Sequence, residues 1–555
     1  MIQLEGSSPV QTSNFAKEIR DEFTDNEINA FKEIINQIIE IKPSKNKLEK
    51  LKREIAKKYK LSKYPRNSDI LKNASEEVYN HVLPYLRIRN VRSLSGVNVI
   101  SVFTAPFACR HGACIFCPGG PSWGTPMSYT GREPGAMRAI SNGFDPISQI
   151  KSRIDQLQAT GHNAEKLEII VMGGTFNSTP TKYQDQFMLG VYEGMNDKPS
   201  KTIEEAKVNN EKAKHRCVGL TFETKPDWST QKHIRKMLEY GVTRVELGIQ
   251  TLQDDVLKIV NRGHDLQETV DAMAALRDAG LKITAHMMPG LPGTTPEIDI
   301  QDFETLYNDP RFIPDEMKIY PTQVIENTPL AKMSINGEYK GLTNEETFHI
   351  MKEAKLLTPP FVRIKRALRD LPIPLVIDGP TWADMRHRIQ KELQEIKDIK
   401  CRCIRCREIG MLYYKDPENF KLGEVKQTLR TYKAAGGTEH FLSYEDDKEI
   451  LIGFIRLRFP SENVIFEALK NASIIRELHV YGSALAIDED DPHIDQSFQH
   501  RGYGRKLLQW AEEMTKEAGY DNIAVISGVG VREYYRKFGY ELDEHDRFYM
   551  VKKLA

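Results

Sequence analysis

Three cysteines stand close together in the stretch FACRHGACIFCPGG, and their spacing suits a metal centre. They are Cys109, Cys114 and Cys117. Three thiolates can bind three irons of a [4Fe-4S] cluster and leave the fourth iron open to a small molecule. Zinc is the main alternative, but it normally takes four ligands, and His111 is too close in sequence to share a tetrahedron easily with all three neighbours. The triplet therefore favours a cluster with one open iron.

A second triplet occurs in KCRCIRCREIG, with Cys401, Cys403 and Cys406. Two tight triplets in a chain with no secretory signal indicate metal ligands rather than disulfides. The close spacing of this second triplet is typical of a structural metal site, and we predict zinc. His387 is the nearest upstream candidate for a fourth ligand. The alternative is three free thiols in a reducing compartment.

A glycine-rich turn near the C-terminus has the pattern of an anion site. Its residues are Gln499, His500, Arg501, Gly502, Tyr503 and Gly504. Such a turn at the start of a helix presents free backbone N–H groups and the positive end of the helix dipole. Downstream, the hydroxyl of Tyr534 or Tyr535 could bond a thioester carbonyl or protonate a leaving thiolate. The alternative is that the two tyrosines only pack against the core.

The elements that must position these groups form two patterns. Between about residues 95 and 380, apolar strand-like runs alternate with amphipathic helices, which predicts a parallel sheet curved into a full or partial barrel. Chemistry in such folds gathers at the C-terminal ends of the strands. Cys109 follows the first run, and the next three runs end in the residues Gly173, Gly174 and Thr175, then Glu223, then Gln250. The last 140 or so residues instead predict antiparallel strands and a helix.

Composition narrows the class of protein. The chain has 555 residues, 40% of them hydrophobic and 28% charged, with a formal net charge of zero. This length predicts two to four domains. No apolar run approaches the roughly 20 residues of a membrane span, and the N-terminus lacks the features of a secretory signal, so we expect a cytoplasmic protein without membrane association.

Two basic segments are candidate contacts for a nucleic acid. Between positions 42 and 66, nine lysines and two arginines surround only two acidic residues. They predict a helical surface for phosphates, with a solvated helix face as the alternative. RIKRALR, at positions 363–369, is expected just after the last barrel strand and has the same two interpretations. The candidate RNA contacts are Lys52, Arg53, Lys57, Lys58, Arg363, Lys365 and Arg366.

The cysteine loop and the Gly-Gly strand end resemble the radical S-adenosylmethionine (SAM) superfamily. The usual spacing there is C-x3-C-x2-C, whereas this chain has C-x4-C-x2-C with the same number of ligands. In that superfamily the open iron chelates SAM. The resemblance implies that Gly173 and Gly174 let the backbone approach SAM, with Thr175 beside them, and that Glu223 and Gln250 face its ribose or methionine part. Alternatively, these two side chains satisfy backbone groups at the strand ends.

Further segments resemble one family within that superfamily. CPGGP, SYTGREPGAMRAI, GHNAEKLEIIVMGGTF, FETKPDW, VELGIQT and KIYPTQVIENTPL resemble the catalytic subunits of Elongator and their single-chain archaeal and bacterial relatives, from about residue 20 to the C-terminus. The resemblance implies a basic helical tRNA-binding region (1–90), a partial β/α barrel (91–385), a zinc-binding linker (386–415) and an acetyl-CoA-binding domain (416–555).

The C-terminal turn and helix resemble GNAT acetyltransferases, which are α+β proteins that bind acetyl-CoA. The resemblance implies that Lys166 contacts coenzyme A from the barrel side and acts with the two tyrosines in catalysis. The implied acetyl-CoA contacts are Lys166, Glu477, Leu478, His479, Val480, Phe498, Gln499, His500, Arg501, Gly502, Tyr503, Gly504 and Tyr535.

The family resemblance also implies an activity. Reductive cleavage of SAM would give a radical that abstracts hydrogen from the acetyl group, whose carbon then adds to C5 of the wobble uridine in a tRNA anticodon stem-loop. Oxidation and thioester hydrolysis would leave a 5-carboxymethyl group. Elongator-like accessory subunits or self-association are possible partners. Two alternatives remain: a protein lysine acetyltransferase with a structural cluster, and a noncatalytic RNA-binding scaffold that senses acetyl-CoA.

Overall fold

The computed structural model describes residues 23–88, 96–369, 371–396, 400–416, 419–481 and 502–554. Contacts divide the chain into two compact units. The first contains the N-terminal helices together with Ser141–Gly143 and Ser152–His162, and the second contains the rest of the chain. The two units are described separately below.

The N-terminal unit is built from four helices. They are α1 (Asp25–Ile41), α2 (Lys45–Lys58), α3 (Asn67–Lys72) and α4 (Glu76–Leu86). Helix α1 begins with a capping box, in which Thr24 and Glu27 each bond the other's backbone N–H. Phe31, Ile34 and Ile38 are spaced at helical intervals and lie buried in one core. The predicted basic helical region is confirmed.

The second unit begins with a curved, fully parallel sheet of seven strands, in the order β1-β2-β3-β4-β5-β6-β8. The strands are β1 (Asn98–Phe103), β2 (Lys166–Met172), β3 (Arg216–Thr224), β4 (Arg244–Gln250), β5 (Lys282–Met287), β6 (Glu316–Ile319) and β8 (Arg363–Arg366). β1 and β8 pair on one side only, so the barrel is not closed. The predicted partial β/α barrel is confirmed.

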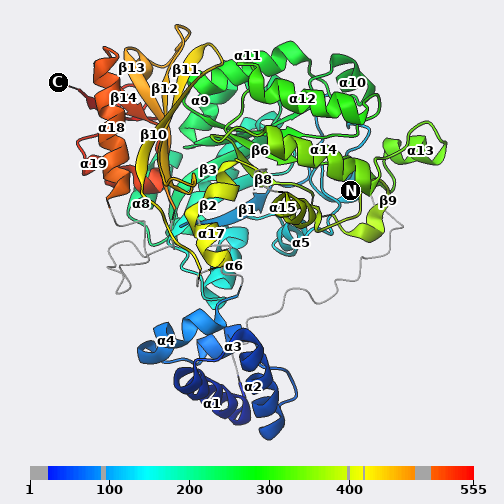
Figure 1. Ribbon diagram of the computed structural model, residues 1–555, viewed down its shortest axis with the longest axis vertical. Helices are drawn as coiled ribbons and strands as arrows, with labels where there is room; N and C mark the ends of the chain where they lie inside the picture. Colours follow the sequence, from blue (N-terminus) through cyan, green and yellow to red (C-terminus); the bar gives the residue numbers. More distant parts are fainter. Residues whose placement is uncertain are drawn as a thin grey trace. The chain divides into compact units, whose positions relative to one another are not determined.

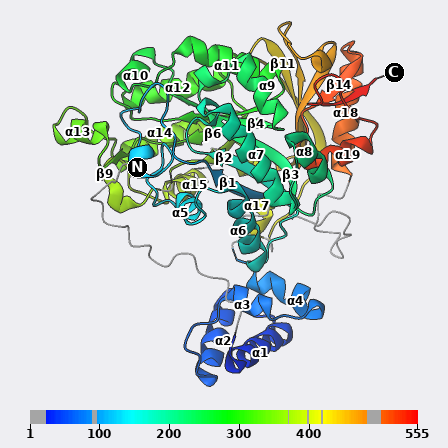
Figure 2. The same ribbon diagram turned by 180° about the vertical axis from the view of Figure 1, so that it is seen from behind.

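Helices connect these strands, and Figures 1 and 2 show α7, α9, α11, α12 and α14 around the outside of the sheet. The helices are α5 (Pro134–Ser141), α6 (Pro146–Ala159), α7 (Thr181–Asn196), α8 (Ile203–Glu211), α9 (Gln231–Glu239), α10 (Asp254–Ile259), α11 (Leu266–Asp278), α12 (Pro296–Asn308), α13 (Pro329–Ile335), α14 (Asn344–Leu357) and α15 (Met385–Glu395). Two short strands, β7 (Val324–Ile325) and β9 (Val376–Asp378), form a separate ribbon. Among the described helices, none is both long enough and apolar enough to cross a membrane.

The C-terminal part forms a second sheet, in the order β10-β11-β12-β13-β14-β16-β15. Its strands are β10 (Lys426–Ala434), β11 (Gly437–Glu445), β12 (Leu451–Phe459), β13 (Ala472–Val480), β14 (Asn522–Val525), β15 (Glu541–Leu542) and β16 (Met550–Lys553). Its helices are α16 (Ile404–Arg407), α17 (Ile409–Lys415), α18 (Tyr503–Glu517) and α19 (Arg532–Arg536). Only β13 and β14 pair in parallel, and α18 packs on the sheet through Leu507, Leu508 and Ala511. The predicted α+β domain is confirmed.

Buried ion pairs join the second sheet to the barrel. Arg476 of β13 is 2% exposed and binds the carboxylate of Asp315, the residue just before β6, with one N–H···O distance of 2.9 Å. Arg458 of β12 is fully buried and binds Asp278 at the end of α11, at 2.6 Å. Removing one partner of such a pair typically costs about 3–5 kcal/mol, because the other charge stays buried. The second sheet is therefore anchored near the N-terminal ends of barrel strands.

Candidate active site

The first cysteine triplet lies on the loop that follows β1. The Sγ atom of Cys114, in a residue only 4% exposed, accepts a bond from Nη1 of Arg262 at 3.7 Å. The Sγ atom of Cys117 lies 3.3 Å from Oγ of Ser128. Thr175, at the end of β2, bonds the side chain of Cys109. Each of the three sulfur atoms thus has a polar neighbour outside the cysteine loop.

The electrostatics of this loop favour neutral thiols until a metal binds. Burial raises the pKa of the Cys117 thiol to about 12 and also raises that of Cys109, although Arg262 and Lys225 oppose the shift at Cys109. Burial, with the charge of Lys225, lowers the pKa of His111 to about 4. Metal binding would replace the thiol protons. The Nδ1 atom of His111 instead accepts a bond from Nζ of Lys225 at 3.1 Å, and its Nε2 atom lies 3.6 Å from Sγ of Cys114.

The residues fit a cluster with three protein ligands. All three thiols come from one loop, and the chain's other four cysteines lie in β3 and in the second triplet. The turn after Cys117 needs glycine: Gly119 has φ of 83°, and a Cβ atom there would overlap the carbonyl oxygen of Tyr129. Ligands of one cluster bind different irons, so their sulfur atoms need not touch.

The glycine turn after β2 lies beside Glu223. Gly173 and Gly174 have φ of 137° and 92°, and their N–H groups donate to Oε2 of Glu223 at 3.3 and 3.5 Å. The hydroxyl of Tyr129 also lies 3.3 Å from that oxygen. A Cβ atom at Gly173 would overlap Oγ1 of Thr104, so this position requires glycine. The carboxylate of Glu223 thus bridges three neighbouring segments.

Gln250 joins the same edge of the sheet. It ends β4 with φ of 77°, a rare conformation for a residue with a side chain, and its Oε1 atom is buried without a hydrogen-bond partner among the described residues. Arg262, which donates to Cys114, also donates to the carbonyl of Gly248 at 2.7 Å. The fold thus brings the cysteine loop, the glycine turn, Glu223 and Gln250 to one edge. Their roles in SAM binding stay predictions.

The concave face of the barrel carries charges, where such interiors normally hold branched apolar side chains. Glu246 of β4 is fully buried; burial would raise its pKa, but Lys318 of β6 and His286 of β5 hold it well below the usual value. The ε-amino group of Lys318 bonds the Glu246 carboxylate, and His286 Nε2 lies 3.3 Å from it. Sequence reasoning missed this cluster, although RVELGIQ, KITAHM and EMKI each place a charged or imidazole side chain inside an apolar run.

Two of the predicted RNA contacts belong to this interior. Residues 363–366 are the last barrel strand, β8, and do not follow it. Arg363 pairs with Glu408 at 2.5 Å, and Lys365 lies 3.3 Å from Glu316. Both side chains are partly buried and pair with carboxylates, and the prediction that they contact RNA stays a prediction. Arg366 is exposed and stays a candidate.

The second predicted site lies where β13 and β14 separate. The two strands pair in parallel from Ala472 to Ile475, after which β13 continues to Val480 with β12 alone as its ladder partner among the described strands. Gly504, in the first turn of α18, lies at this gap: a Cβ atom there would come within 2.8 Å of the Tyr534 hydroxyl and 3.9 Å of Val480. Three predicted acetyl-CoA segments thus converge here. Phe498, Gln499, His500 and Arg501 lie outside the described residues.

The two candidate tyrosines have different surroundings. Tyr535 is 6% exposed and packs in the core of the second sheet, where burial raises its pKa. Tyr534 is only half-buried and its hydroxyl points to the start of α18. Of the two, Tyr534 therefore has the position that could meet a thioester. Tyr535 has the packing role that was its alternative interpretation, and its catalytic role stays a prediction.

Of the other predicted acetyl-CoA contacts, Glu477 faces the barrel, whereas Leu478 and Tyr503 pack against the core of the second sheet. Glu477 of β13 pairs with Lys282, at the start of β5, at 2.5 Å. Burial lowers the pKa of His479, which favours its neutral form. Lys166 begins β2 beside Arg216, and a Cβ atom at Gly530, just before α19, would crowd that arginine at 2.6 Å. Lys166 therefore lies at the edge of the barrel that faces the second sheet.

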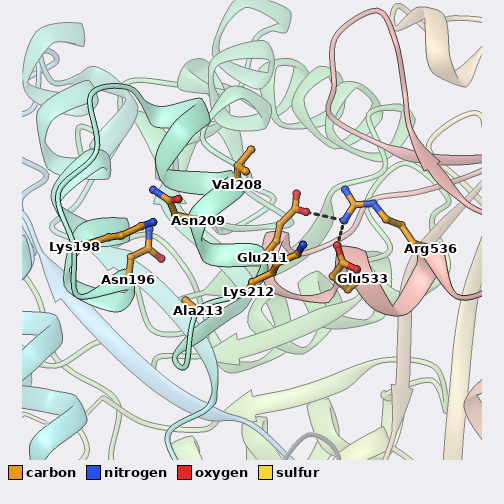
Figure 3. Close-up of a pocket in the computed structure, with 9 residues that line it drawn as sticks. All are labelled: Asn196, Lys198, Val208, Asn209, Glu211, Lys212, Ala213, Glu533 and Arg536. Carbon is orange, nitrogen blue, oxygen red and sulfur yellow. Dashed lines mark hydrogen bonds and ion pairs between the residues drawn. The ribbon is translucent and has the colours of Figure 1, made fainter.

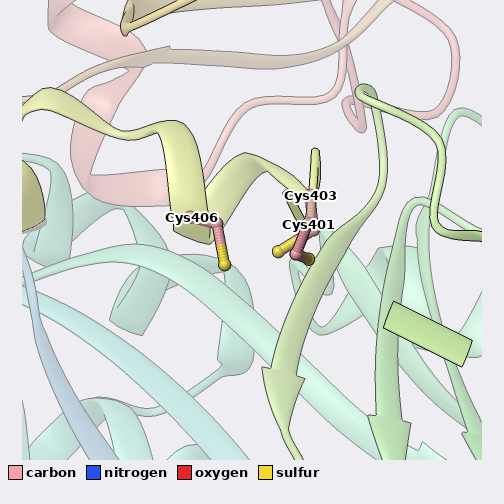
Figure 4. A group of neighbouring side chains, drawn as sticks. All are labelled: Cys401, Cys403 and Cys406. Carbon is pink, nitrogen blue, oxygen red and sulfur yellow. The ribbon is translucent and has the colours of Figure 1, made fainter. Parts of the chain in front are cut away.

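The second cysteine triplet forms a compact group, which Figure 4 shows at the start of α16. The Sγ atoms of Cys401, Cys403 and Cys406 lie within 4.8 Å of one another, and hydrogen bonds from the other two thiols lower the pKa of Cys403 well below its usual value. Three of the four ligands that a structural zinc ion takes are thus together, and zinc itself stays a prediction. His387 is exposed on α15 and is not part of the group; Gln390 Oε1 lies 3.7 Å from Cys406.

The N-terminal basic residues divide into exposed and buried ones. Arg53, Lys57 and Lys58 of α2 are exposed, and Lys58 pairs with Glu33 at 2.7 Å. Lys52 is only 3% exposed, and its ammonium group bonds Asn67 at 2.8 Å. A side chain that anchors the helical core in this way is not available to a phosphate, so the RNA contact predicted for Lys52 is corrected.

A surface pocket of about 670 Å³ lies between α8 and α19 (Figure 3). Arg536 lines it and bonds Glu211 at 2.7 Å, and it also bonds Glu533. None of the predicted site residues lines this pocket. Its lining carries three cationic side chains, Lys198, Lys212 and Arg536, and two carboxylates, Glu211 and Glu533, both of which bond Arg536.

Comparisons with known proteins agree with these domains. Family models match the ELP3 N-terminal domain over residues 27–94, the Radical SAM superfamily over 106–305, the Radical_SAM C-terminal domain over 314–395 and the Acetyltransferase (GNAT) family over 405–540. Each match covers one part of the chain.

Several relatives match nearly the whole chain. A "tRNA uridine(34) acetyltransferase" of Methanocaldococcus infernus is 44% identical over 90% of this chain and 94% of its own length. The "Elongator complex protein 3" of Dictyostelium discoideum is 41% identical over 97% and 96%. The solved structure of the archaeal Methanocaldococcus infernus Elp3 with an N-terminal deletion aligns with a TM-score of 0.72 and 39% identity, covering 83% of this chain and all of that one. The resemblance seen in the sequence is confirmed: the chain belongs to the Elongator complex protein 3 family.

Proposed function

We propose that this protein is a tRNA-modifying enzyme that uses SAM and acetyl-CoA to place a carboxymethyl group on C5 of the wobble uridine. One observation carries the proposal: the candidate SAM site and the candidate acetyl-CoA site belong to the same compact unit. The charged concave face of the barrel lies between them. The cysteine loop, the glycine turn and Gln250 share one edge. Glu477 and Lys282 meet at the other.

On the first edge, the chain would hold the cluster and SAM. Cys109, Cys114 and Cys117 would bind three irons; the cluster, when bound, supplies the electron that cleaves SAM. The N–H groups of Gly173 and Gly174 and the carboxylate of Glu223 would orient the methionine part. The unpartnered Oε1 atom of Gln250 is free to accept a bond from an amino or hydroxyl group.

On the second edge, the chain would hold acetyl-CoA. The first turn of α18 would receive the pyrophosphate, because its backbone N–H groups have no partner within the helix. The open side of β13 beyond Ile475 would bond the pantetheine arm, and Tyr534 would donate its hydroxyl proton toward the thioester. Lys166 would contact coenzyme A from the barrel side.

The acetyl group would cross the barrel to reach SAM. Barrel strands of six or seven residues are roughly 20 Å long. The acetyl group would have to cover about this distance between the two ends of the barrel. The charged concave face, with Glu246 and Lys318, offers a polar lining for that path. Burial of so many charges is costly, which is a reason to expect a functional use.

The partner in this proposal is a tRNA anticodon stem-loop. Arg53, Lys57 and Lys58 offer an exposed basic face for its phosphates, and Arg366 is exposed at the C-terminal end of β8. The target base would leave its stack to reach the barrel. The relatives named Elongator complex protein 3 support accessory subunits as further partners, with self-association as the alternative, and cytoplasmic action agrees with this substrate.

A reconstitution assay tests the proposal. Anaerobically reconstituted protein, tRNA, SAM, acetyl-CoA and a reductant should yield 5-carboxymethyluridine, detected by mass spectrometry of the nucleosides. Cys114→Ala should abolish the product. Tyr534→Phe should reduce the yield, and Tyr535→Phe, which keeps the packing ring, tests whether the Tyr535 hydroxyl also takes part. No modified nucleoside from the wild type would contradict the proposal, and acetylation of a protein lysine without SAM would favour an acetyltransferase instead.

A further inference from the structure

Helix α12 holds the turn that follows β4 through a single buried carboxylate. Asp302 is 3% exposed, and its Oδ2 atom accepts the hydroxyl of Thr251 at 2.7 Å and the backbone N–H of Leu252 at 2.9 Å. Its Oδ1 atom accepts the side-chain amide of Gln253 at 2.7 Å. Three successive residues of one turn therefore donate to one carboxylate.

The residue just before this turn is Gln250, whose backbone is strained. Its φ of 77° is unfavourable for a residue with a Cβ atom, and such strain persists only where the surroundings impose it. The pairing of β4 with β5 shifts between Gly248 and Gln250, and the carbonyl of Gln250 accepts the N–H of Met288 at 2.7 Å. The turn is thus fixed on both sides of the strained peptide.

The strained backbone of Gln250 sets the direction of its side chain. The Oε1 atom of Gln250 is buried and has no partner among the described residues, and its Nε2 atom lies near Gly248, to which Arg262 also bonds. Arg262 in turn donates to Cys114. A polar atom that is buried and unpaired beside the cysteine loop indicates a missing ligand group.

We propose that Asp302 is a positioning residue for SAM binding, acting through Gln250. The inference rests on the proposed function, because it assigns SAM as the group that Gln250 meets. Asp302 itself touches no cofactor. Its three bonds hold Thr251, Leu252 and Gln253 so that the strained backbone of Gln250 keeps its amide oxygen turned into the site, instead of relaxing to an ordinary strand conformation.

The same helix offers a matched control. Asp299, one turn earlier and also 3% exposed, accepts the N–H of Gly290 at 2.7 Å in the turn after β5. It is as buried as Asp302 but does not contact residues 251–253. Glu304 is exposed on α12, so a substitution there is a control for changes confined to the helix surface.

The first experiment measures hydrogen exchange of the protein without cofactors. Asp302→Ala should speed exchange of the Leu252 amide at least about tenfold, because its acceptor is removed. Asp302→Asn should change it little, since the remaining oxygen still accepts from Leu252 and the Gln253 amide can turn to accept from the new N–H group. Asp299→Ala and Glu304→Gln should leave this amide unchanged. Unchanged exchange in Asp302→Ala would overturn the inference.

The second experiment measures SAM affinity from the perturbation of the reconstituted cluster spectrum. Asp302→Ala should weaken binding about tenfold or more, because a small misplacement of an orienting group is costly. Asp302→Asn should restore most of it. In a Gln250→Ala background, Asp302→Ala should add nothing further, because both changes remove the same contact.

The outcomes separate the two proposals. A wild-type cluster that does not respond to SAM would overturn the proposed function and this inference with it. A wild-type response that is unchanged in Asp302→Ala, or a loss that simply adds to that of Gln250→Ala, would overturn the role of Asp302 alone. A loss equal to that of Asp299→Ala would show a general need for buried carboxylates in α12 and would also overturn it.

Discussion

The two cysteine triplets consist of the same residue type but have different arrangements. The first is a loop whose sulfur atoms are met by Thr175, Ser128 and Arg262, from three other parts of the chain. The second is a compact group whose sulfur atoms lie within 4.8 Å of one another. A spread set can serve a cluster with several irons, whereas a compact set can bind one ion.

The two triplets also lie beside different elements of the fold. The first triplet stands at the C-terminal edge of the barrel, next to the residues proposed to bind SAM. The second lies near Lys355 of α14 and Gln390 of α15, and the N–H of Ile404 donates to the carbonyl of Val362, just before β8. The first triplet lies where barrel folds carry their active sites. The second joins the end of the barrel to the sheet that follows.

The largest expected effect is loss of chemistry on removing one cluster ligand. Cys114→Ala should reduce tRNA modification below detection while leaving acetyl-CoA binding within about twofold, because the two edges are built from different elements. Modified nucleoside and acetyl-CoA affinity would be measured on one preparation. Substantial modification by this variant would break the proposed distinction between the triplets.

A ligand substitution in the second triplet should act on stability. Cys403→Ala should remove one zinc per chain and lower the thermal midpoint by more than about 5 °C, since loss of a structural metal is among the most destabilising changes. Metal analysis and thermal unfolding would test this. Iron content should stay near that of the wild type, and a parallel loss of iron would show that the triplets are not independent.

Exposure of the wild-type protein to oxygen should distinguish the metal of the first triplet from that of the second. Brief exposure to air should remove iron and activity but leave zinc bound, because zinc has no redox chemistry while an iron-sulfur cluster is readily oxidised. Iron and zinc would be measured before and after exposure. Equal loss of both metals would contradict the assignment of zinc to the second triplet.

The smallest effect is expected at His387. His387→Ala should change zinc content by less than about 20% and hardly alter the thermal midpoint, because exposed side chains away from a site contribute little. Gln390→Ala is the comparison, since Gln390 lies beside Cys406. Loss of zinc in His387→Ala would mean that the histidine moves to complete the site when the metal binds.

Local sequence patterns were sufficient for six of the seven barrel strands but missed β8, because residues 363–369 were expected just after the last strand. The apolar runs predicted parallel strands, and the glycines at positions 173 and 504 marked places where a Cβ atom would come within 2.2 and 2.8 Å of a side-chain oxygen. The helical spacing of Ile34, Ile35, Ile38 and Ile39 indicates a helix, on which the first three are buried and Ile39 is exposed. These features depend on residues near one another in the chain, so spacing alone reveals them.

Burial and pairing of charges could not be predicted in this way. Lys52, Arg363 and Lys365 have the composition of an RNA surface, but their partners Asn67, Glu408 and Glu316 are distant in the chain. The same holds for the carboxylate of Asp302 and for the difference between Tyr534 and Tyr535.

By itself, the sequence determined the two thiol triplets, the glycine turns and most of the barrel strands of this protein. Only the tertiary structure decided which charges lie inside and which hydroxyl faces the gap between β13 and β14. The physical reason is that backbone conformation depends mainly on neighbouring residues, whereas the cost of burying a polar group depends on whatever partner the fold brings to it.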